Sequence, residues 1–242
     1  MLLNLLRSGL SPKEMLFYGI VMFFALTLSF SIHEFMHAAV ADWLGDPTPR
    51  NMGRLTLNPL AHLDIAGTIL LLFAGFGWGK PVMYNPNRLN RFKSPRLMNI
   101  MVHLAGVTGN FFLALISGII ATVIGCLSSG RVDPYSNAYI AVTAVALAFS
   151  YTMDFSLMLL AFNLLPIPPL DGFHVLEELL PYKVKMTEGY HKFEMIAPYG
   201  ILVLFILSYT SGISILSELI SWIKLPFSLA ITFICNLIAQ FF

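Results

Sequence analysis

Long runs of apolar residues constrain the fold of this chain more than any other feature of its sequence. The runs lie near residues 11–44, 97–126, 138–165, 195–222 and 225–242. A helix needs about 20 residues to cross the hydrocarbon core of a bilayer, and runs of this length can do so. Charged residues make up only 11% of the chain, whereas soluble domains carry about 25%. The sequence therefore predicts an integral membrane protein, with residues 1–242 forming one membrane domain.

Charge and cysteine content exclude several other classes of protein. The formal net charge is +1 and no tract of Lys or Arg is present, so the sequence carries no electrostatic footprint for nucleic acid. Its two cysteines, Cys126 and Cys235, lie far apart within apolar segments. Such spacing predicts neither a disulfide framework nor a thiolate metal site. The sequence thus favours the lipid bilayer as a partner and excludes nucleic acid.

The first long helix has clear signals at both ends. Ser11 can cap it, Pro12 suits the first helical position, and Glu14 completes a capping box with Ser11. The apolar run continues to about Leu44, where the turn-forming stretch GDPTP ends it. A helix of about 33 residues is roughly 50 Å long, which exceeds the hydrocarbon thickness. The helix must therefore protrude, tilt or kink.

The segment between the first two long runs, residues 45–96, is more polar than the runs and contains a single short apolar stretch. Residues 45–65 are polar and rich in turns, and the alternating stretch GRLTLNP within them is compatible with a short strand. Residues 66–78 form an apolar run that is too short for a comfortable span, which favours a re-entrant or interfacial segment. We predict an all-α polytopic membrane protein with about five transmembrane helices, this short segment, and small β-strands in the preceding loop.

The distribution of basic residues predicts the orientation of the chain. Ten of the fourteen Lys and Arg residues fall in two stretches, residues 42–96 and 181–192. They are Arg50, Arg54, Lys80, Arg88, Arg91, Lys93, Arg96, Lys183, Lys185 and Lys192. If both stretches face the cytoplasm, the run at 97–126 leads outward and the run at 138–165 leads back. The first helix then enters from outside, segment 66–78 does not cross, and the strand-bearing loop is cytoplasmic.

Residues 33–37, HEFMH, place two histidines and a glutamate inside one of the most apolar parts of the chain. On a helix, residues four apart face the same way and lie about 6 Å apart along the axis. His33 and His37 can therefore converge on one metal ion, with Glu34 beside the water that the metal holds. This is the H-E-x-x-H arrangement of zinc hydrolases. Ionisable groups are costly inside a membrane and rarely idle there, which favours a function over hydrogen bonding within a helix bundle.

A catalytic zinc ion needs a third protein ligand and an open coordination position. Asp171, in NLLPIPPLDGFHV, is the strongest candidate among the remaining histidines and acids. Three prolines within residues 166–169 end the preceding apolar run and free backbone groups at membrane depth. Irregular backbone is tolerated there only where it is buried in protein or lines a wet cavity. This break and the two histidines all fall near the cytoplasmic ends of their helices, so the three ligands can meet.

Two separated motifs resemble the site-2 proteases, the family of intramembrane zinc metalloproteases. They are HEFMH at 33–37 and N-x-x-P-x-P-x-L-D-G at 163–172, each on its own apolar run. A looser similarity extends over residues 20–180 through NPLAHLD, GT, GWGKPV and AGVTGN. The length leaves no room for a PDZ-like or CBS domain, so we expect a compact member of the family. We expect residues 15–180 to form the catalytic core and 195–242 to form accessory transmembrane helices. The motifs of the core lie within 15–44, 97–126 and 138–180.

The resemblance implies a metal site and a reaction. By it, His33, His37 and Asp171 hold one zinc ion (Zn2+) per chain, and Glu34 is the catalytic acid/base. Zinc lowers the pKa of its bound water and polarises the scissile carbonyl of a peptide. Glu34 takes the proton of that water and passes it to the leaving amine. The substrates implied are transmembrane proteins or peptides.

The resemblance also implies positions that meet the substrate. Asn163 and Pro166 match residues that line the substrate path in the family, and Asn110 matches the asparagine of its A-G-P-x-x-N element. Two departures concern the local backbone: Val107 stands where that element usually has proline, and Ile65 stands where many bacterial relatives have proline. A substrate helix must unwind before its carbonyls can react, and we expect the extended chain to add as a strand to GKPVMY or GRLTL.

Four further polar residues have a structural interpretation beside a functional one. For His62, a structural hydrogen bond is favoured over a position at the mouth of the site. For His103, inside an apolar run, a hydrogen-bonded bundle histidine is favoured over contact with the site. His174 follows Asp171 by three residues and either orients that ligand or lies at an interface. Asp154 lies in mid-span, where a lone acid is expensive, and its function stays open.

The sequence leaves three functions open. The leading one is an intramembrane endopeptidase that cleaves transmembrane segments, in regulated intramembrane proteolysis or in clearance of membrane peptides. A zinc-binding carrier is less favoured, because Glu34 would have no special purpose in it and no inverted repeat is visible. A membrane chaperone that binds segments without cutting them is less favoured, because the catalytic residues are all present. The resemblance leans toward a bacterial or archaeal cell membrane, with the active site near its cytoplasmic side.

Overall fold

Four long helices form the frame of the protein in a computed structural model, which describes residues 9–74, 77–133, 136–211 and 215–242. They are α2 (Pro12–Trp43), α6 (Pro95–Ser128), α7 (Asn137–Asn163) and α11 (Ile215–Ala239), and each is long and apolar enough to cross a membrane. The expected number of about five is not supported. Helix α10 (Glu188–Ser211) opens with EGYHKFE, and the described apolar part that follows, residues 195–211, is shorter than the about 20 residues of a span.

Helix α2 begins and ends as its sequence predicts. The Ser11 hydroxyl and the Glu14 carboxylate form the reciprocal capping box, in which the Ser11 backbone N–H donates to Glu14 Oε2 at 2.8 Å. After Trp43 the chain turns at Gly45, whose φ of +114° is a conformation that residues with a Cβ rarely adopt. The helix of 32 residues is about 48 Å long, so it exceeds the hydrocarbon core.

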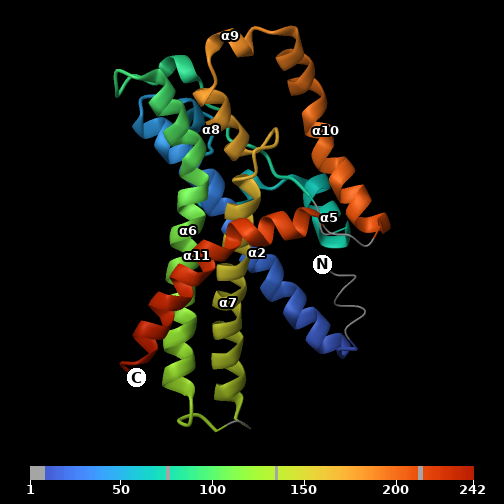
Figure 1. Ribbon diagram of the computed structural model, residues 1–242. Helices are drawn as coiled ribbons and strands as arrows, with labels where there is room; N and C mark the ends of the chain where they lie inside the picture. Colours follow the sequence, from blue (N-terminus) through green and yellow to red (C-terminus); the bar gives the residue numbers. More distant parts are fainter. Residues whose placement is uncertain (1–8, 75–76, 134–135, 212–214) are drawn as a thin grey trace.

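Helix α6 lies at the centre of the bundle and packs against α2 and α7, while α11 crosses both α6 and α7 (Figure 1). Small side chains permit the close approach of these helices. A Cβ on Gly109 of α6 would collide with Met36 of α2. Between α2 and α7, the buried hydroxyls of Ser29 and Ser156 share a hydrogen bond of 2.8 Å. Helix α6 continues without interruption through Val107, where the family element usually has proline.

The loop between α2 and α6 contains short helices in place of the predicted β-strands. These are α3 (Thr48–Asn51), α4 (Pro59–His62), α5 (Ile65–Ala74) and η1 (Pro86–Arg88). Among the described residues there is no sheet, and only an isolated antiparallel bridge joins Leu63 to Gly79. The prediction of a strand at GRLTLNP was wrong because side chains satisfy the backbone locally. The Asn58 N–H donates to Thr56 Oγ1, and the Leu60 N–H donates to Asn58 Oδ1, each at 3.1 Å.

The short apolar segment predicted at residues 66–78 contains α5, although residues 75–76 lie outside the part that the structure describes. A helix of ten residues rises about 15 Å, which is half of a hydrocarbon core of about 30 Å. Helix α5 is therefore too short to span a bilayer. It begins at Ile65, the second departure from the family pattern.

The chain after α7 carries the remaining elements. A turn at residues 164–170 contains the three prolines, and it is followed by α8 (Asp171–Leu179) and α9 (Tyr182–Lys185).

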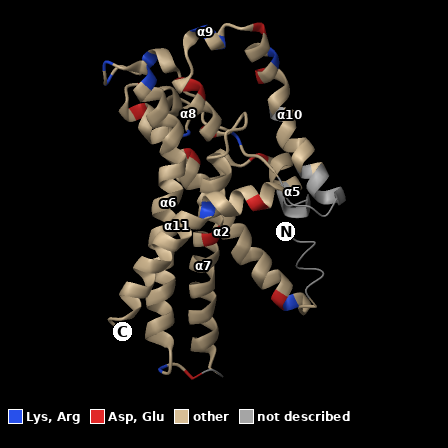
Figure 2. Ribbon diagram, in the orientation of Figure 1, with Lys and Arg blue, Asp and Glu red and all other residues tan. Residues whose placement is uncertain are grey.

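Basic residues gather at the end of the molecule that holds α8, α9 and the loop before α6, which agrees with the predicted charge asymmetry (Figure 2). The last two apolar runs were expected to separate between residues 222 and 225. Helix α11 instead runs through this point and through Pro226, and the charged Lys224 within it is paired with Asp154 of α7.

Candidate metal centre

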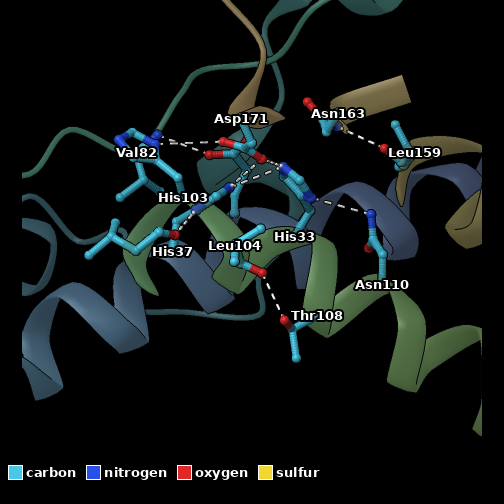
Figure 3. Close-up of polar contacts among 12 residues, drawn as sticks. His33, His37, Val82, His103, Leu104, Thr108, Asn110, Leu159, Asn163 and Asp171 are labelled. Carbon is cyan, nitrogen blue, oxygen red and sulfur yellow. Dashed lines mark hydrogen bonds and ion pairs between the residues drawn. The ribbon is translucent and has the colours of Figure 1, made fainter. Parts of the chain in front are cut away.

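Three side chains with metal-binding atoms meet where α2 and α8 come together beside α6 (Figure 3). His33 and His37 lie one turn apart on α2, and Asp171 is the first residue of α8. The Nε2 atoms of the two imidazoles are 3.1 Å apart. Asp171 Oδ2 lies 3.2 Å from His33 Nε2 and 3.3 Å from His37 Nε2. The three atoms thus form a nearly equilateral triangle.

The triangle fits a tetrahedrally bound zinc ion. Zinc binds imidazole nitrogen and carboxylate oxygen at about 2.0–2.1 Å, and the edges of a tetrahedron of that size measure about 3.3 Å. Asp171 Oδ2 is buried and has no hydrogen-bond partner, as expected for an atom aimed at a cation. Burial raises the pKa of Asp171, but His37 and His33 outweigh burial and hold that pKa well below its ordinary value. Asp171 Oδ2 faces the two imidazole nitrogens with which it would share a cation.

Asn110 of α6 fixes the ring of His33 from behind. Its amide lies 3.3 Å from His33 Nδ1, and the residue is completely buried. For Nε2 to bind a cation, His33 must carry its hydrogen on Nδ1, so the acceptor is the amide oxygen. Turning the amide about its last bond exchanges oxygen and nitrogen, and it gives Asn110 Oδ1 the partner that it otherwise lacks. Asn110 therefore orients a ligand and does not line the cavity described below.

The backbone of α6 holds the second histidine in the same way. His37 Nδ1 donates to the carbonyl oxygen of Val102 at 2.7 Å, which leaves Nε2 free to bind a cation. One turn further along α6, Gly106 faces both rings. A Cβ at Gly106 would collide with His37 Nε2 and would lie 2.6 Å from His33 Nδ1. The glycine in AGVTGN thus provides the space in which the two imidazoles stand.

Glu34 lies beside the ligand triangle but is not one of the three residues that form it. The side chain is buried, and its Oε2 accepts a hydrogen bond of 2.9 Å from the backbone N–H of Val82. Val82 belongs to the loop segment that precedes η1, and two other bonds hold this segment in position. The Lys80 N–H donates to the His62 carbonyl at 2.7 Å, and the Asn85 N–H donates to Asp46 at 2.6 Å. A carboxylate held in this way can accept a proton from a water molecule at the metal.

A second group of polar side chains adjoins Asp171 on the side away from the two histidines. His103 Nδ1 lies 4.0 Å from Asp171 Oδ1, its Nε2 lies 3.1 Å from the Tyr84 hydroxyl, and its ring stacks on that of His174. His174 Nδ1 is 3.2 Å from the Glu177 carboxylate. Burial, together with nearby carboxylates, raises the pKa of Tyr84, so the phenol stays neutral and can donate. His103 makes the hydrogen bond expected of a bundle histidine and also lies next to the metal centre.

A cavity of about 400 Å³ opens beside the metal centre, and its wall includes His33 and Glu34. Asn163 lies in this wall, and its amide nitrogen donates to the Leu159 carbonyl at 3.0 Å. Of the prolines that follow α7, Pro169 lines the cavity and Pro166 is exposed and does not. The remaining wall is mostly apolar. The cavity can therefore hold an apolar segment of chain next to a metal ion and a carboxylate.

Two of the polar residues noted in the sequence lie away from the ligand triangle. His62 is fully buried, and its Nε2 bonds the Thr56 carbonyl at 2.9 Å, which is the structural role that the sequence favours. Asp154 of α7 pairs with Lys224 of α11, with 2.9 Å between Oδ1 and Nζ. Sequence reasoning missed this partner, and it also missed the backbone groups of Val82 and Val102. Backbone groups leave no signal in residue type, and a long-range ion pair is visible only after folding.

Comparison with known proteins identifies the same chemistry. A model of peptidase family M50 matches residues 128–208, which include Asp171 but not the HEFMH motif. A Bacillus subtilis (strain 168) protein named as a candidate zinc metalloprotease, YwhC, is 39% identical over 187 residues, covering 76% of this chain and 78% of that protein. Rip2 of Mycolicibacterium smegmatis (strain ATCC 700084 / mc(2)155), named in the same way, is 32% identical over 62% of this chain and 53% of its own length. No solved structure gives a significant match.

Proposed function

This chain belongs to peptidase family M50, the site-2 protease family of zinc metalloproteases, and on that premise we propose that it is an intramembrane endopeptidase that cleaves transmembrane segments of membrane proteins. One observation carries the proposal. Glu34, next in sequence to His33, lies in the wall of an apolar cavity that reaches the ligand triangle. A carrier would need the triangle alone, whereas hydrolysis also needs a base and room for a substrate.

The residues at the site divide the work of hydrolysis among them. His33, His37 and Asp171 hold one zinc ion per chain, which supplies Lewis acidity toward the attacking water and the scissile carbonyl. Glu34 accepts the proton of that water as the bond to the carbonyl carbon forms. Glu34 then gives the proton to the nitrogen of the leaving amine as the peptide bond breaks. The Val82 N–H holds the Glu34 carboxylate in position before the first of these reaction steps.

The reaction takes place within the thickness of the membrane, near its cytoplasmic face. His33 precedes the end of α2 at Trp43 by ten residues, which corresponds to about 15 Å of helix. The end of the molecule nearest to the site carries most of the basic residues (Figure 2), and basic loops face the cytoplasm. We place the protein in a bacterial or archaeal cell membrane, and the bacterial origin of the two relatives supports the first of these. The cleavage serves regulated proteolysis or the clearance of membrane peptides.

The substrate meets the site as an extended chain. A helical backbone hides its carbonyls, so the segment must unwind before attack. Residues 79–84 form no helix, and the Val82 N–H among them bonds Glu34, so an unwound segment can pair with them as a strand. Asn163 in the cavity wall keeps a second amide hydrogen and an oxygen with which to bond the substrate backbone. Pro166 lies outside the wall of this cavity, in the turn that carries the chain from α7 to Asp171.

Cleavage by purified protein tests the proposal. The protein in detergent is incubated with a panel of single-span membrane substrates, with Glu34→Gln beside the wild type. Glu194→Gln is the matched control, because Glu194 is a partly exposed glutamate of α10 that does not line the cavity. Bound zinc is measured on all three. We expect the wild type and Glu194→Gln to cut, and Glu34→Gln to bind zinc without cutting. Equal behaviour of wild type and Glu34→Gln, with zinc bound in both, would instead support a carrier or a membrane chaperone.

A further inference from the structure

The wall of the cavity includes a helix that lies outside both the family match at residues 128–208 and the core predicted at 15–180. Leu216 and Ile220 of α11 line the same cavity as His33 and Glu34. They are four residues apart, so both side chains fall on one face of α11. The residues of α2 at the site and the helix that bounds their cavity therefore come from opposite ends of the chain.

This face of α11 is firmly packed. Leu216 is buried against Leu165 and Leu170, which belong to the turn that leads from α7 to Asp171. Ile220 packs on that cluster and also on Leu160 of α7. Because side chains in such clusters have little freedom to shift, the shape of the cavity on this side is defined by Leu216 and Ile220.

An ion pair fixes the register of α11 one turn further on. Lys224, four residues after Ile220, places its Nζ 2.9 Å from Oδ1 of Asp154 on α7. Both residues lie within membrane-spanning helices, where an unpaired charge is costly. A rotation or a slide of α11 would separate the two charges. The pair therefore keeps the face with Leu216 and Ile220 turned toward the cavity.

We propose that Leu216 and Ile220 are specificity-determining residues that limit the size of the substrate side chain next to the scissile bond. The proposal rests on the function proposed above, because it concerns the same cavity. Most of the other wall residues, among them Phe30, Met158 and Phe162, are apolar, so the side chain accepted there is apolar too. Removing side-chain volume at Ile220 makes room for a larger residue, and adding volume at Leu216 restricts the cavity to smaller ones.

The structure supplies a matched control for the test. Ile223 has the same side chain as Ile220, lies on the same helix and packs against the same two clusters, but it does not line the cavity. Ile220→Ala and Ile223→Ala therefore remove the same atoms from the same packing, and only the first enlarges the cavity. Any difference in substrate preference between them reports on the cavity and not on the stability of α11.

The experiment measures kcat/KM for a single-span model substrate whose cut position has been mapped by mass spectrometry. The residues on either side of the cut are varied singly among Ala, Leu, Phe and Trp. At one of the two positions we expect Ile220→Ala to raise the Trp-to-Leu ratio about tenfold, and Leu216→Phe to lower it. Ile223→Ala leaves the ratio within about twofold of wild type.

Three outcomes would overturn the inference and leave the proposed function intact, provided that the wild type cuts and Glu34→Gln does not. They are equal shifts in Ile220→Ala and Ile223→Ala, no shift in either, and a shift toward smaller residues in Ile220→Ala. If Ile220→Ala fails to fold, Ile220→Val replaces it. That variant removes one methyl group, and a smaller shift in the same direction is expected from it. Failure of the wild type to cut any substrate would count against the proposed function itself.

Discussion

The backbone N–H of Val82 donates a hydrogen bond of 2.9 Å to Glu34 Oε2, which joins the loop before α6 to the proposed base on α2. Hydrogen bonds hold the loop in position on both sides of Val82. The Lys80 N–H donates to the His62 carbonyl, and the Asn85 N–H donates to the carboxylate of the buried Asp46. Glu34 is therefore oriented by the fold before any substrate arrives. Orientation of this kind lowers the cost of reaching the reactive geometry.

The first prediction concerns this bond. Val82→Pro removes the N–H, and hydrogen bonds to charged groups contribute about 1.5–3 kcal/mol. We expect kcat to fall about 10–100-fold with zinc content unchanged, because the ligands do not touch Val82. Val82→Ala keeps the N–H and should retain kcat within about twofold. Steady-state kinetics with metal analysis on both variants provides the check, and a proline variant as fast as wild type would refute the positioning role.

The second prediction separates two asparagines that the family resemblance groups together. Asn110 bonds His33, whereas Asn163 lines the cavity. Residues that orient a metal ligand typically change metal affinity about 10–100-fold when removed. Asn110→Ala should therefore lose zinc at about tenfold lower chelator concentration than wild type. Asn163→Ala should keep wild-type zinc retention and raise KM. Titration of both variants with a chelator, followed by zinc analysis, decides between these roles, and equal retention by both would contradict the assignment.

The third prediction uses two glycines of one helix. A Cβ at Gly106 of α6 would collide with the imidazoles of His33 and His37, whereas nothing lies within 4 Å of a Cβ at Gly125. Gly106→Ala should displace the ligands and abolish both zinc binding and cleavage. Gly125→Ala should keep both and gain up to about 1 kcal/mol of helix stability. Zinc content and thermal unfolding of the two variants test this pair. Wild-type zinc binding in Gly106→Ala would show that the rings do not occupy this position.

The sequence predicted those parts of the site that depend on local periodicity. His33 and His37 share a face of α2 because they are four residues apart, and the capping signals located the start of that helix. The convergence of Asp171 on the histidines could be expected only from the order and depth of the helices. The ends of α10 and α11 were misjudged, since a nearly continuous apolar run does not reveal where one helix stops. The loop strands were misjudged because side-chain hydrogen bonds compete with strand pairing there.

Contacts between distant segments were beyond the reach of the sequence. Val82 and Val102 act through backbone atoms, so their residue type gives no hint of their role. Asp154 was recognised as an expensive charge in mid-span, but its partner Lys224 is 70 residues away and lies between two apolar runs that carry no motif. Such pairs depend on how the helices cross, which in turn depends on the packing of all the side chains between them.

The last prediction concerns that ion pair. Lys224→Met leaves Asp154 without its counter-charge inside the membrane, where a lone acid costs about 2.5–3.5 kcal/mol at the centre of a span. The side chain of Asp154 is 57% exposed on the protein itself, so lipid or detergent and not protein surrounds most of it. We expect Lys224→Met to unfold at a clearly lower temperature than wild type in lipid nanodiscs.

The double variant Asp154→Leu/Lys224→Met serves as the control, because replacing both charges of a pair by apolar groups is often neutral or stabilising. It should recover the unfolding temperature that the single variant loses. It should not recover the wild-type preference among substrate side chains, since apolar residues do not hold α11 to one register. Recovery of both properties would mean that packing alone sets the position of α11. A single variant as stable as wild type would mean that the two charges do not meet in the membrane.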